Sequence, residues 1–74
     1  RVITQNNPRI ISTEHEINAN EKVMVFINCN PEDAKTTLQI KDGWKISSNL
    51  YGDKTQNNDV IIKANDALVL MLKK

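Results

Sequence analysis

Nine carboxylate side chains are the residues of this sequence with the most direct route to chemistry. Two carboxyl groups held about 5 to 9.5 Å apart across a cleft can hydrolyse a glycosidic bond. The acids fall mainly in expected loops and at the ends of expected strands: Glu14, Glu16, Glu21, Glu32, Asp33, Asp42, Asp53, Asp59 and Asp66. Loops and strand ends are the ordinary places for solubilising charge. We therefore expect no catalytic pair.

His15 and Cys29 are the only histidine and the only cysteine of the 74 residues. A zinc site needs several converging ligands, and a disulfide needs a second cysteine. We expect a solvated or partly packed imidazole at His15 and a small, half-buried thiol at a strand end at Cys29. With only two glycines, Gly43 and Gly52, the chain cannot form a glycine-rich phosphate loop. The sequence predicts no metal and no cofactor.

Aromatic side chains, whose flat faces stack on sugar rings, are the remaining candidates for a binding site. Trp44 begins a run in which the alternate residues Ile46 and Leu50 are apolar. This pattern favours a core position for Trp44, because one large ring dominates a small core. Tyr51 ends the same run beside a turn, and packing and ligand contact are equally compatible with its position. Trp44 and Tyr51 are thus the contacts that a carbohydrate-binding hypothesis predicts.

Length and charge restrict the class of protein. A chain of 74 residues buries only about 60% of its unfolded surface, which leaves little room for both a core and a substrate pocket. The net charge is +1 without a basic cluster, which argues against nucleic acid binding. No apolar run has the roughly 18 residues of a membrane span and no leader is visible, so we expect a soluble chain, either cytoplasmic or exported. A start at Arg1 suggests a piece of a longer protein.

Apolar patterning predicts strands along most of the chain. Lys22 to Asn28 is apolar on both faces, as expected of a central strand, and Thr36 to Lys41 alternates, as expected of a strand with one wet face. The six consecutive apolar residues Ala67 to Leu72 predict a last strand that is buried on both faces and closes the domain. We expect deletion of Ala67 to Lys74 to unfold the protein.

Asp42-Gly43 separates two alternating runs and predicts a β-hairpin from Thr36 to Leu50. A type I′ turn needs positive φ at both central residues, and Asp and Gly tolerate it. In the second run, alternation directs Trp44, Ile46, Ser48 and Leu50 towards the core.

The strand count and the absence of a helical period predict an all-β fold. We expect a small antiparallel β-sandwich of six to seven strands with Greek-key-like connections. Residues 1–8 are expected to be a flexible lead-in or linker, and residues 9–74 a single β-sandwich domain excised from a larger enzyme.

Four segments follow one another in a familiar order: "KVMVFINCN", "LQIKDGW", "SSNLYGDK" and "DVIIKANDALVLML". This order resembles the C-terminal β-domain of the alpha-amylase family of glycoside hydrolases, over about Arg9 to Lys74. The matching positions are Asn28, Gly43-Trp44, Leu50 to Gly52 and Ala67 to Leu72.

The resemblance implies a non-catalytic accessory domain that packs against a (β/α)8 barrel of the same parent chain and stabilises it. The barrel would carry the catalytic carboxylates and act on α-glucosidic bonds in starch, glycogen or maltodextrins. Many members of the family bind calcium outside this domain. The matching positions are structural, so the resemblance transfers no functional residue to this chain.

Two alternatives stay open beside the accessory domain. The chain would be a carbohydrate-binding module if Trp44 and Tyr51 formed an exposed, coplanar platform, and a surface-protein β-sandwich without sugar affinity if it offered no such feature. An exposed apolar patch where a barrel docks would favour the accessory domain.

Overall fold

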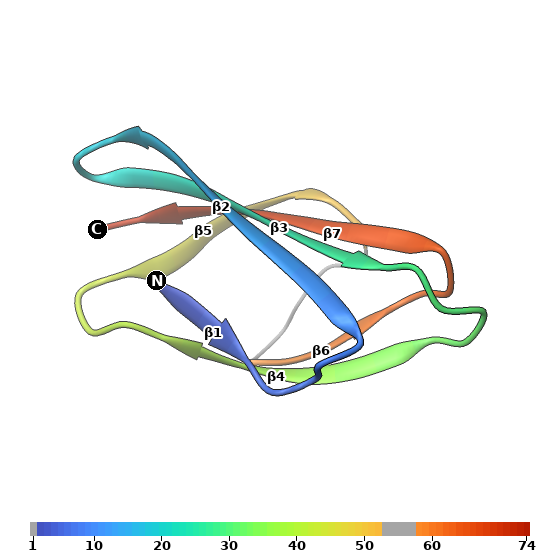
Figure 1. The fold of residues 1–74 in the computed structure, drawn as a ribbon. Coiled ribbons are helices and arrows are strands. Elements are labelled where there is room, and N and C mark those ends of the chain that lie inside the picture. The colour runs from blue at the N-terminus through green and yellow to red at the C-terminus, as the bar shows by residue number, and fades with distance from the viewer. Residues whose placement is uncertain (1, 53–57) are drawn as a thin grey trace.

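The computed structural model describes residues 2–52 and 58–74; the acid Asp53 lies outside these ranges. The described residues form seven strands and no helix: β1 (Ile3–Gln5), β2 (Ile10–Asn18), β3 (Glu21–Asn28), β4 (Ala34–Ile40), β5 (Lys45–Tyr51), β6 (Asp59–Ile62) and β7 (Asp66–Lys73). The strands pair antiparallel in two sheets, β1-β4-β6 and β2-β3-β7-β5, which face each other (Figure 1). The predicted antiparallel β-sandwich is confirmed.

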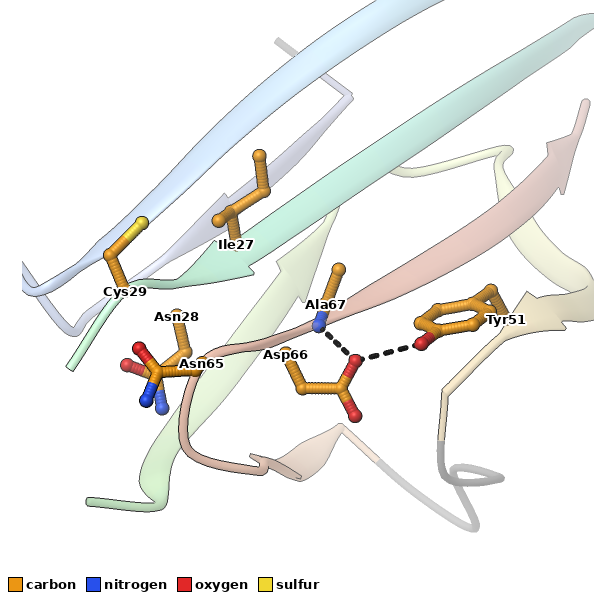
Figure 2. A pocket seen from close by; sticks show the side chains of 7 residues that line it. All are labelled: Ile27, Asn28, Cys29, Tyr51, Asn65, Asp66 and Ala67. Atoms are coloured by element: carbon orange, nitrogen blue, oxygen red, sulfur yellow. Dashed lines mark hydrogen bonds between the residues drawn. The ribbon is translucent and has the colours of Figure 1, made fainter. Parts of the chain in front are cut away.

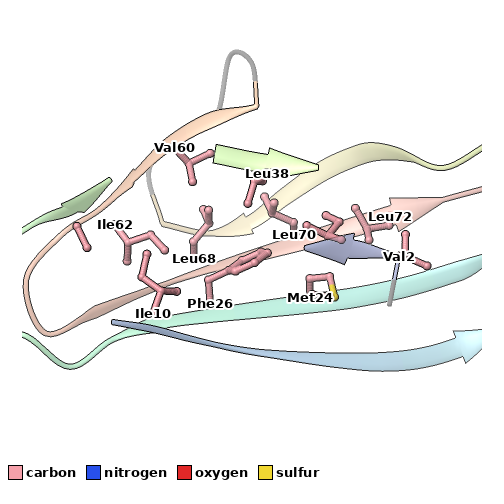
Figure 3. Packing of buried hydrophobic residues seen from close by; sticks show 12 residues of the cluster. Val2, Ile10, Met24, Phe26, Leu38, Val60, Ile62, Leu68, Leu70 and Leu72 are labelled. Carbon is pink, nitrogen blue, oxygen red and sulfur yellow. The ribbon is translucent and has the colours of Figure 1, made fainter. Parts of the chain in front are cut away.

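The core lies between the two sheets and consists of alternate residues of each strand. Figure 3 shows the buried side chains that meet there, and β3 and β7 supply five of them: Met24, Phe26, Leu68, Leu70 and Leu72, all at most 1% exposed. Burying one such side chain stabilises the fold by about 1.5 to 3 kcal/mol. The last strand predicted from the sequence, Ala67 to Leu72, is present as β7.

Burial of β7 on both faces, however, was a wrong prediction. Leu68, Leu70 and Leu72 are buried, whereas the intervening Val69 and Met71 are only half-buried. The second face of β7 belongs to the outside of the sandwich, where no further layer of the described chain covers it.

The stretch expected to be a flexible lead-in contains a core strand. β1 pairs with the end of β4 from Ile3 opposite Ile40 to Gln5 opposite Leu38, and Ile3 is 1% exposed. Two consecutive apolar residues among polar ones are too few to establish a strand period, so the sequence pattern missed this element.

Asp42-Gly43 forms a turn, but the predicted hairpin is wrong. The Trp44 amide donates a hydrogen bond to the Lys41 carbonyl over 3.1 Å, and Gly43 has a φ of 88°. Asp42 does not have positive φ, so the turn is not type I′. The strands on either side belong to different sheets, because β4 pairs with β1 and β6 while β5 pairs with β7. The turn carries the chain from one sheet to the other.

Two register shifts in β5 overturn the predicted alternation of its side chains. The pairing with β7 slips between Ile46 and Ser48, and again between Asn49 and Tyr51. Each bulge inserts one residue and so exchanges the inward and outward faces of the strand. Ile46 packs against the core, but Leu50, predicted to point inward, is 53% exposed, and Ser48 is exposed as well.

The buried side chain of Asn28 joins the end of β3 to two connections. Its Nδ2 donates to the carbonyls of Glu32 at 2.9 Å, Ile62 at 3.0 Å and Lys63 at 3.3 Å. Its Oδ1 accepts from the backbone amide and the side chain of Asn30, at 3.0 and 2.8 Å. Asn28 is 0% exposed, so these bonds replace all of its contacts with water. One residue thus fixes the β3–β4 and β6–β7 loops to each other.

Candidate functional site

The outer face of the four-stranded sheet is apolar along its two central strands, β3 and β7, and at Ile11 of β2, whereas Thr13 and His15 of β2 are polar residues on the same face. Cross-strand neighbours in β2, β3 and β7 form rows such as Ile11, Ile27 and Ala67. Ile11 is 55% exposed, and the residues from the two central strands are half-buried. We name this surface the outer apolar face, and its members are Ile11, Val23, Val25, Ile27, Ala67, Val69 and Met71.

A hollow of about 350 Å³ lies at one end of the outer apolar face. Figure 2 shows the short side chain of Ala67 between Ile27 and the ring of Tyr51. The small size of Ala67 leaves the space that a longer side chain would fill. Seven described residues line the hollow: Ile27, Asn28, Cys29, Tyr51, Asn65, Asp66 and Ala67.

Gly52 allows the end of β5 to lie against β7 and so places Tyr51 at the hollow. Gly52 has a φ of 96°, and a Cβ atom there would lie 2.7 Å from the carbonyl oxygen of Ala67. Any other residue would push the two strands apart. The hydroxyl of Tyr51 then donates a hydrogen bond to Oδ1 of Asp66 over 3.0 Å, while the side chain stays 56% exposed. The phenol is therefore held at its tip and open to solvent elsewhere.

Asp66 is the only charged residue among the described residues that line the hollow. Its Oδ1 also accepts from the Ala67 amide at 2.8 Å, whereas Oδ2 accepts no hydrogen bond from the part of the chain that the structure describes. The hydrogen bond to this carboxylate, and then its charge, raise the pKa of the Tyr51 phenol above its usual value. The site therefore combines one free carboxylate oxygen, an exposed ring and an apolar floor.

The turn before β7 positions Asn65 and Asp66. Asn65 has a φ of 53°, in the left-handed region, and its amide donates to the Asn30 carbonyl over 3.1 Å. The Asp66 amide donates to the Lys63 carbonyl over 3.2 Å. Neither Asn65 nor Asp66 is predicted from the sequence to bind a ligand. One feature of the sequence could have indicated them. Two polar residues directly before a buried strand lie at the end of a sheet, and loops at sheet ends often carry binding residues.

Trp44 and Tyr51, the two residues predicted to contact carbohydrate, do not form one platform. Trp44 packs against the core at the other end of β5, and Lys22 Nζ lies 5.5 Å from the centroid of its ring, a cation–π distance. The seven residues of β5 separate the two aromatics by roughly 20 Å of extended chain. Only Tyr51 lines the hollow.

The other residues selected from the sequence lie apart. His15 is exposed, and its Nε2 lies 3.0 Å from Oγ1 of Thr13. Cys29 is exposed at the hollow rather than half-buried as predicted. Within residues 2–52 and 58–74, no three of the His, Cys, Asp and Glu side chains converge in a way that could hold a metal ion.

Glu14, on the inner side of β2, has a structural role. Its Oε1 accepts from the Val2 amide at 2.8 Å and its Oε2 forms an ion pair with Lys22 at 3.0 Å. The Val2 hydrogen bond, followed by that of Lys22, lowers the pKa of Glu14, against an opposing effect of burial. Glu14, in β2, therefore contacts both Val2, the residue directly before β1, and Lys22 of β3.

No family model, no curated protein and no solved structure matches this chain. Among the described residues, no helix has the length and apolar character needed to cross a membrane. The function must therefore be inferred from the outer apolar face and the hollow at its end.

Proposed function

We propose that this chain is the non-catalytic accessory domain of an alpha-amylase-type glycosidase acting on starch, glycogen or maltodextrins. In this role it packs through the outer apolar face against the catalytic barrel of the same parent protein and stabilises it. The single observation that supports the proposal is this contiguous apolar surface, which is exposed at Ile11 and half-buried at its other residues, since contiguous apolar surface in contact with water marks interaction sites in soluble proteins.

The opposite sheet provides an internal comparison. On the outside of β4, the residues Lys35, Thr37 and Gln39 are polar and exposed, as expected of a sheet face in contact with water. On the outside of β3, the corresponding positions hold β-branched apolar residues, with Val25 at their centre. The three-stranded sheet carries Ile61 of β6, 54% exposed, beside these polar residues, whereas the apolar residues on the outside of β3 and β7 are neighbours of one another. A group of adjacent apolar residues on one outer face is the pattern expected when a partner covers that face.

The sequence that precedes Arg1 in the parent gene is the first test. A (β/α)8 barrel with carboxylates at its strand ends is expected there, because catalytic residues of such barrels lie at the C-terminal ends of the strands. A parent protein that lacks any barrel would refute the proposal.

A substitution on the outer apolar face is the second test, made in the full parent chain. Val69→Lys would place a charge in the proposed interface and is expected to lower the temperature at which the barrel loses hydrolytic activity. Gln39→Lys, on the polar outer face of β4, is the matched control and should leave that temperature unchanged, because Gln39 is exposed. Equal effects of the two variants would show that the outer apolar face does not dock.

A second candidate function is carbohydrate binding, and the exposed ring of Tyr51 beside Asp66 and Asn65 favours it. The packing of Trp44 against the core argues against the two-aromatic form of this hypothesis. Titration of the chain with maltoheptaose, followed by NMR, tests it. Saturable shifts around Tyr51 would support a binding module. A chain with neither sugar binding nor a docked barrel would fit the third hypothesis, a surface-protein sandwich.

A further inference from the structure

We propose that the hollow at the end of the outer apolar face is a socket for an arginine side chain of the partner that docks on this face. The inference rests on the proposed docking function and adds to it the chemistry of one contact. It assigns to Asp66 the role of ion-pair partner and to Tyr51 that of a stacking surface.

The hollow is continuous with the outer apolar face, because Ile27 and Ala67 belong to both. A partner that covers the face must also cover the hollow or leave a gap beside the interface. Side chains that insert into pockets supply much of the binding free energy of protein interfaces, and arginine is one of the residues enriched in that role.

The charge of Asp66 determines which side chain fits. Docking would remove water from the carboxylate, and burying an ion without a partner is strongly unfavourable. Oδ1 already accepts hydrogen bonds from Tyr51 and Ala67, but neither donor is cationic, and Oδ2 accepts none within the described residues. A neutral occupant, such as a sugar, would leave the charge uncompensated. Charge complementarity therefore favours a cationic occupant over a neutral one.

The shape of the hollow favours arginine over lysine. The guanidinium group is planar and weakly hydrated, it stacks on aromatic rings, and it pairs with carboxylates. The hollow offers an apolar floor at Ala67 and an exposed ring at Tyr51, which is held by its hydrogen bond to Asp66. A lysine ammonium carries the same charge but cannot stack on the ring of Tyr51. It is also more strongly hydrated than a guanidinium group, so its transfer from water into the hollow is less favourable.

The test uses the 74-residue chain with N-acetyl-arginine methylamide as the probe, followed by ¹H–¹⁵N NMR. We expect saturable shifts at the backbone amides of Tyr51, Asp66 and Ala67, with a dissociation constant on the order of 10 mM that rises with added salt. The citrulline analogue has nearly the same shape without the charge. It is expected to bind at least about tenfold more weakly, as the loss of one charge-assisted contact implies.

Two variants and one control locate the binding. Asp66→Asn keeps an oxygen acceptor for Tyr51 and Ala67 but removes the charge, and should weaken binding by about fivefold or more. Ala67→Leu fills the hollow and should abolish it. Asp42→Asn, an exposed acid at the opposite end of β5, is the matched control and should have no effect.

The proposal is overturned if the arginine and citrulline probes bind equally, if Asp66→Asn binds like the wild type, or if no shift occurs up to about 100 mM probe. Shifts produced at these amides by maltose but not by arginine would assign the hollow to carbohydrate instead. The docking proposal is tested separately by Val69→Lys in the parent chain. Failure of the arginine probe together with an effect of Val69→Lys would reject the socket and leave the docking face in place.

Discussion

Replacement of the buried Asn28 is expected to remove a large share of the stability of the fold. The side chain is 0% exposed and takes part in hydrogen bonds with three backbone carbonyls and with Asn30. Its two amide protons serve three acceptors, so the bond to Lys63, at 3.3 Å, is the weakest of the three. Asn28→Ala removes all of these bonds and leaves the carbonyls of Glu32 and Ile62 without their donor.

The structure allows an estimate of the cost. A typical hydrogen bond contributes about 1 kcal/mol, and a buried polar group left unsatisfied costs about 1 to 3 kcal/mol. Asn28→Ala is therefore expected to lower the free energy of unfolding by about 3 to 5 kcal/mol. The whole domain has a stability of roughly 4 to 11 kcal/mol on the usual per-residue scale, so the variant should be close to unfolding.

Asn28→Asp should be more damaging than Asn28→Ala at neutral pH. It directs a carboxylate oxygen at the carbonyl oxygens of Glu32 and Ile62, which Nδ2 now approaches to 2.9 and 3.0 Å. Burial and these oxygens would raise the pKa of the new carboxyl in the folded state. A raised pKa means that the deficit relative to wild type grows as the pH rises through that value and shrinks at acid pH.

Urea unfolding followed by the fluorescence of Trp44, the only tryptophan, measures these effects. Asn20→Ala is the control, since Asn20 is exposed, and it should change the stability by less than about 0.5 kcal/mol. A loss below about 1 kcal/mol for Asn28→Ala, or a deficit of Asn28→Asp that grows at acid pH, would refute the assigned role of this side chain.

Three further predictions concern the core, the strand junction and the hollow. Leu70→Ala, at a residue that is 0% exposed, should cost about 3 to 4 kcal/mol in urea unfolding, whereas Val69→Ala on the outer side of β7 should cost about 1 kcal/mol; equal costs would contradict the assignment of the two faces. The lowered pKa of Glu14 contributes stability above its unfolded pKa of about 4.3 that is lost as the pH falls through the folded value. Glu14→Gln should therefore be less stable than wild type by about 1 kcal/mol at neutral pH and equal to it at about pH 2, and a difference independent of pH would count against the Glu14 contacts. Asp66→Asn should return the raised pKa of Tyr51 towards about 10 in an ultraviolet titration of this single tyrosine, and an unchanged titration would mean that the Asp66 carboxylate does not perturb the phenol in solution.

Local patterning was sufficient to predict the strands that dominate the core. β3 and β7 have apolar residues at consecutive positions, and β4 alternates apolar and polar residues. Successive side chains of a strand point to opposite faces, so a few neighbouring residues are enough to show which face can be buried. β1 escaped prediction, since Val2 and Ile3 are too few to display that period.

Strand pairing could not be predicted in the same way. Asp42-Gly43 correctly indicates a turn, because turn propensity belongs to the two residues themselves. Whether the flanking strands then pair depends on what else each strand can pair with, and β5 pairs with β7 while β4 pairs with β1 and β6. The bulges in β5 also depend on the partner strand, because they adjust the register of β5 to that of β7. The alternation within the β5 sequence therefore does not predict them.

Residue pattern was thus enough for the all-β class and for the inner residues of the regular strands, but it left Tyr51 equally compatible with packing and with ligand contact. Only the folded chain shows that Trp44 and Tyr51 lie apart, that one sheet keeps an uncovered apolar side, and that Asp66 and Ala67 meet Tyr51 in a hollow. The apolar side results from the pairing of β2, β3 and β7, and the place of Tyr51 from the pairing of β5 with β7. The free energy of each pairing is a sum over contacts, many of them between residues distant in the chain. No short window of sequence contains those contacts.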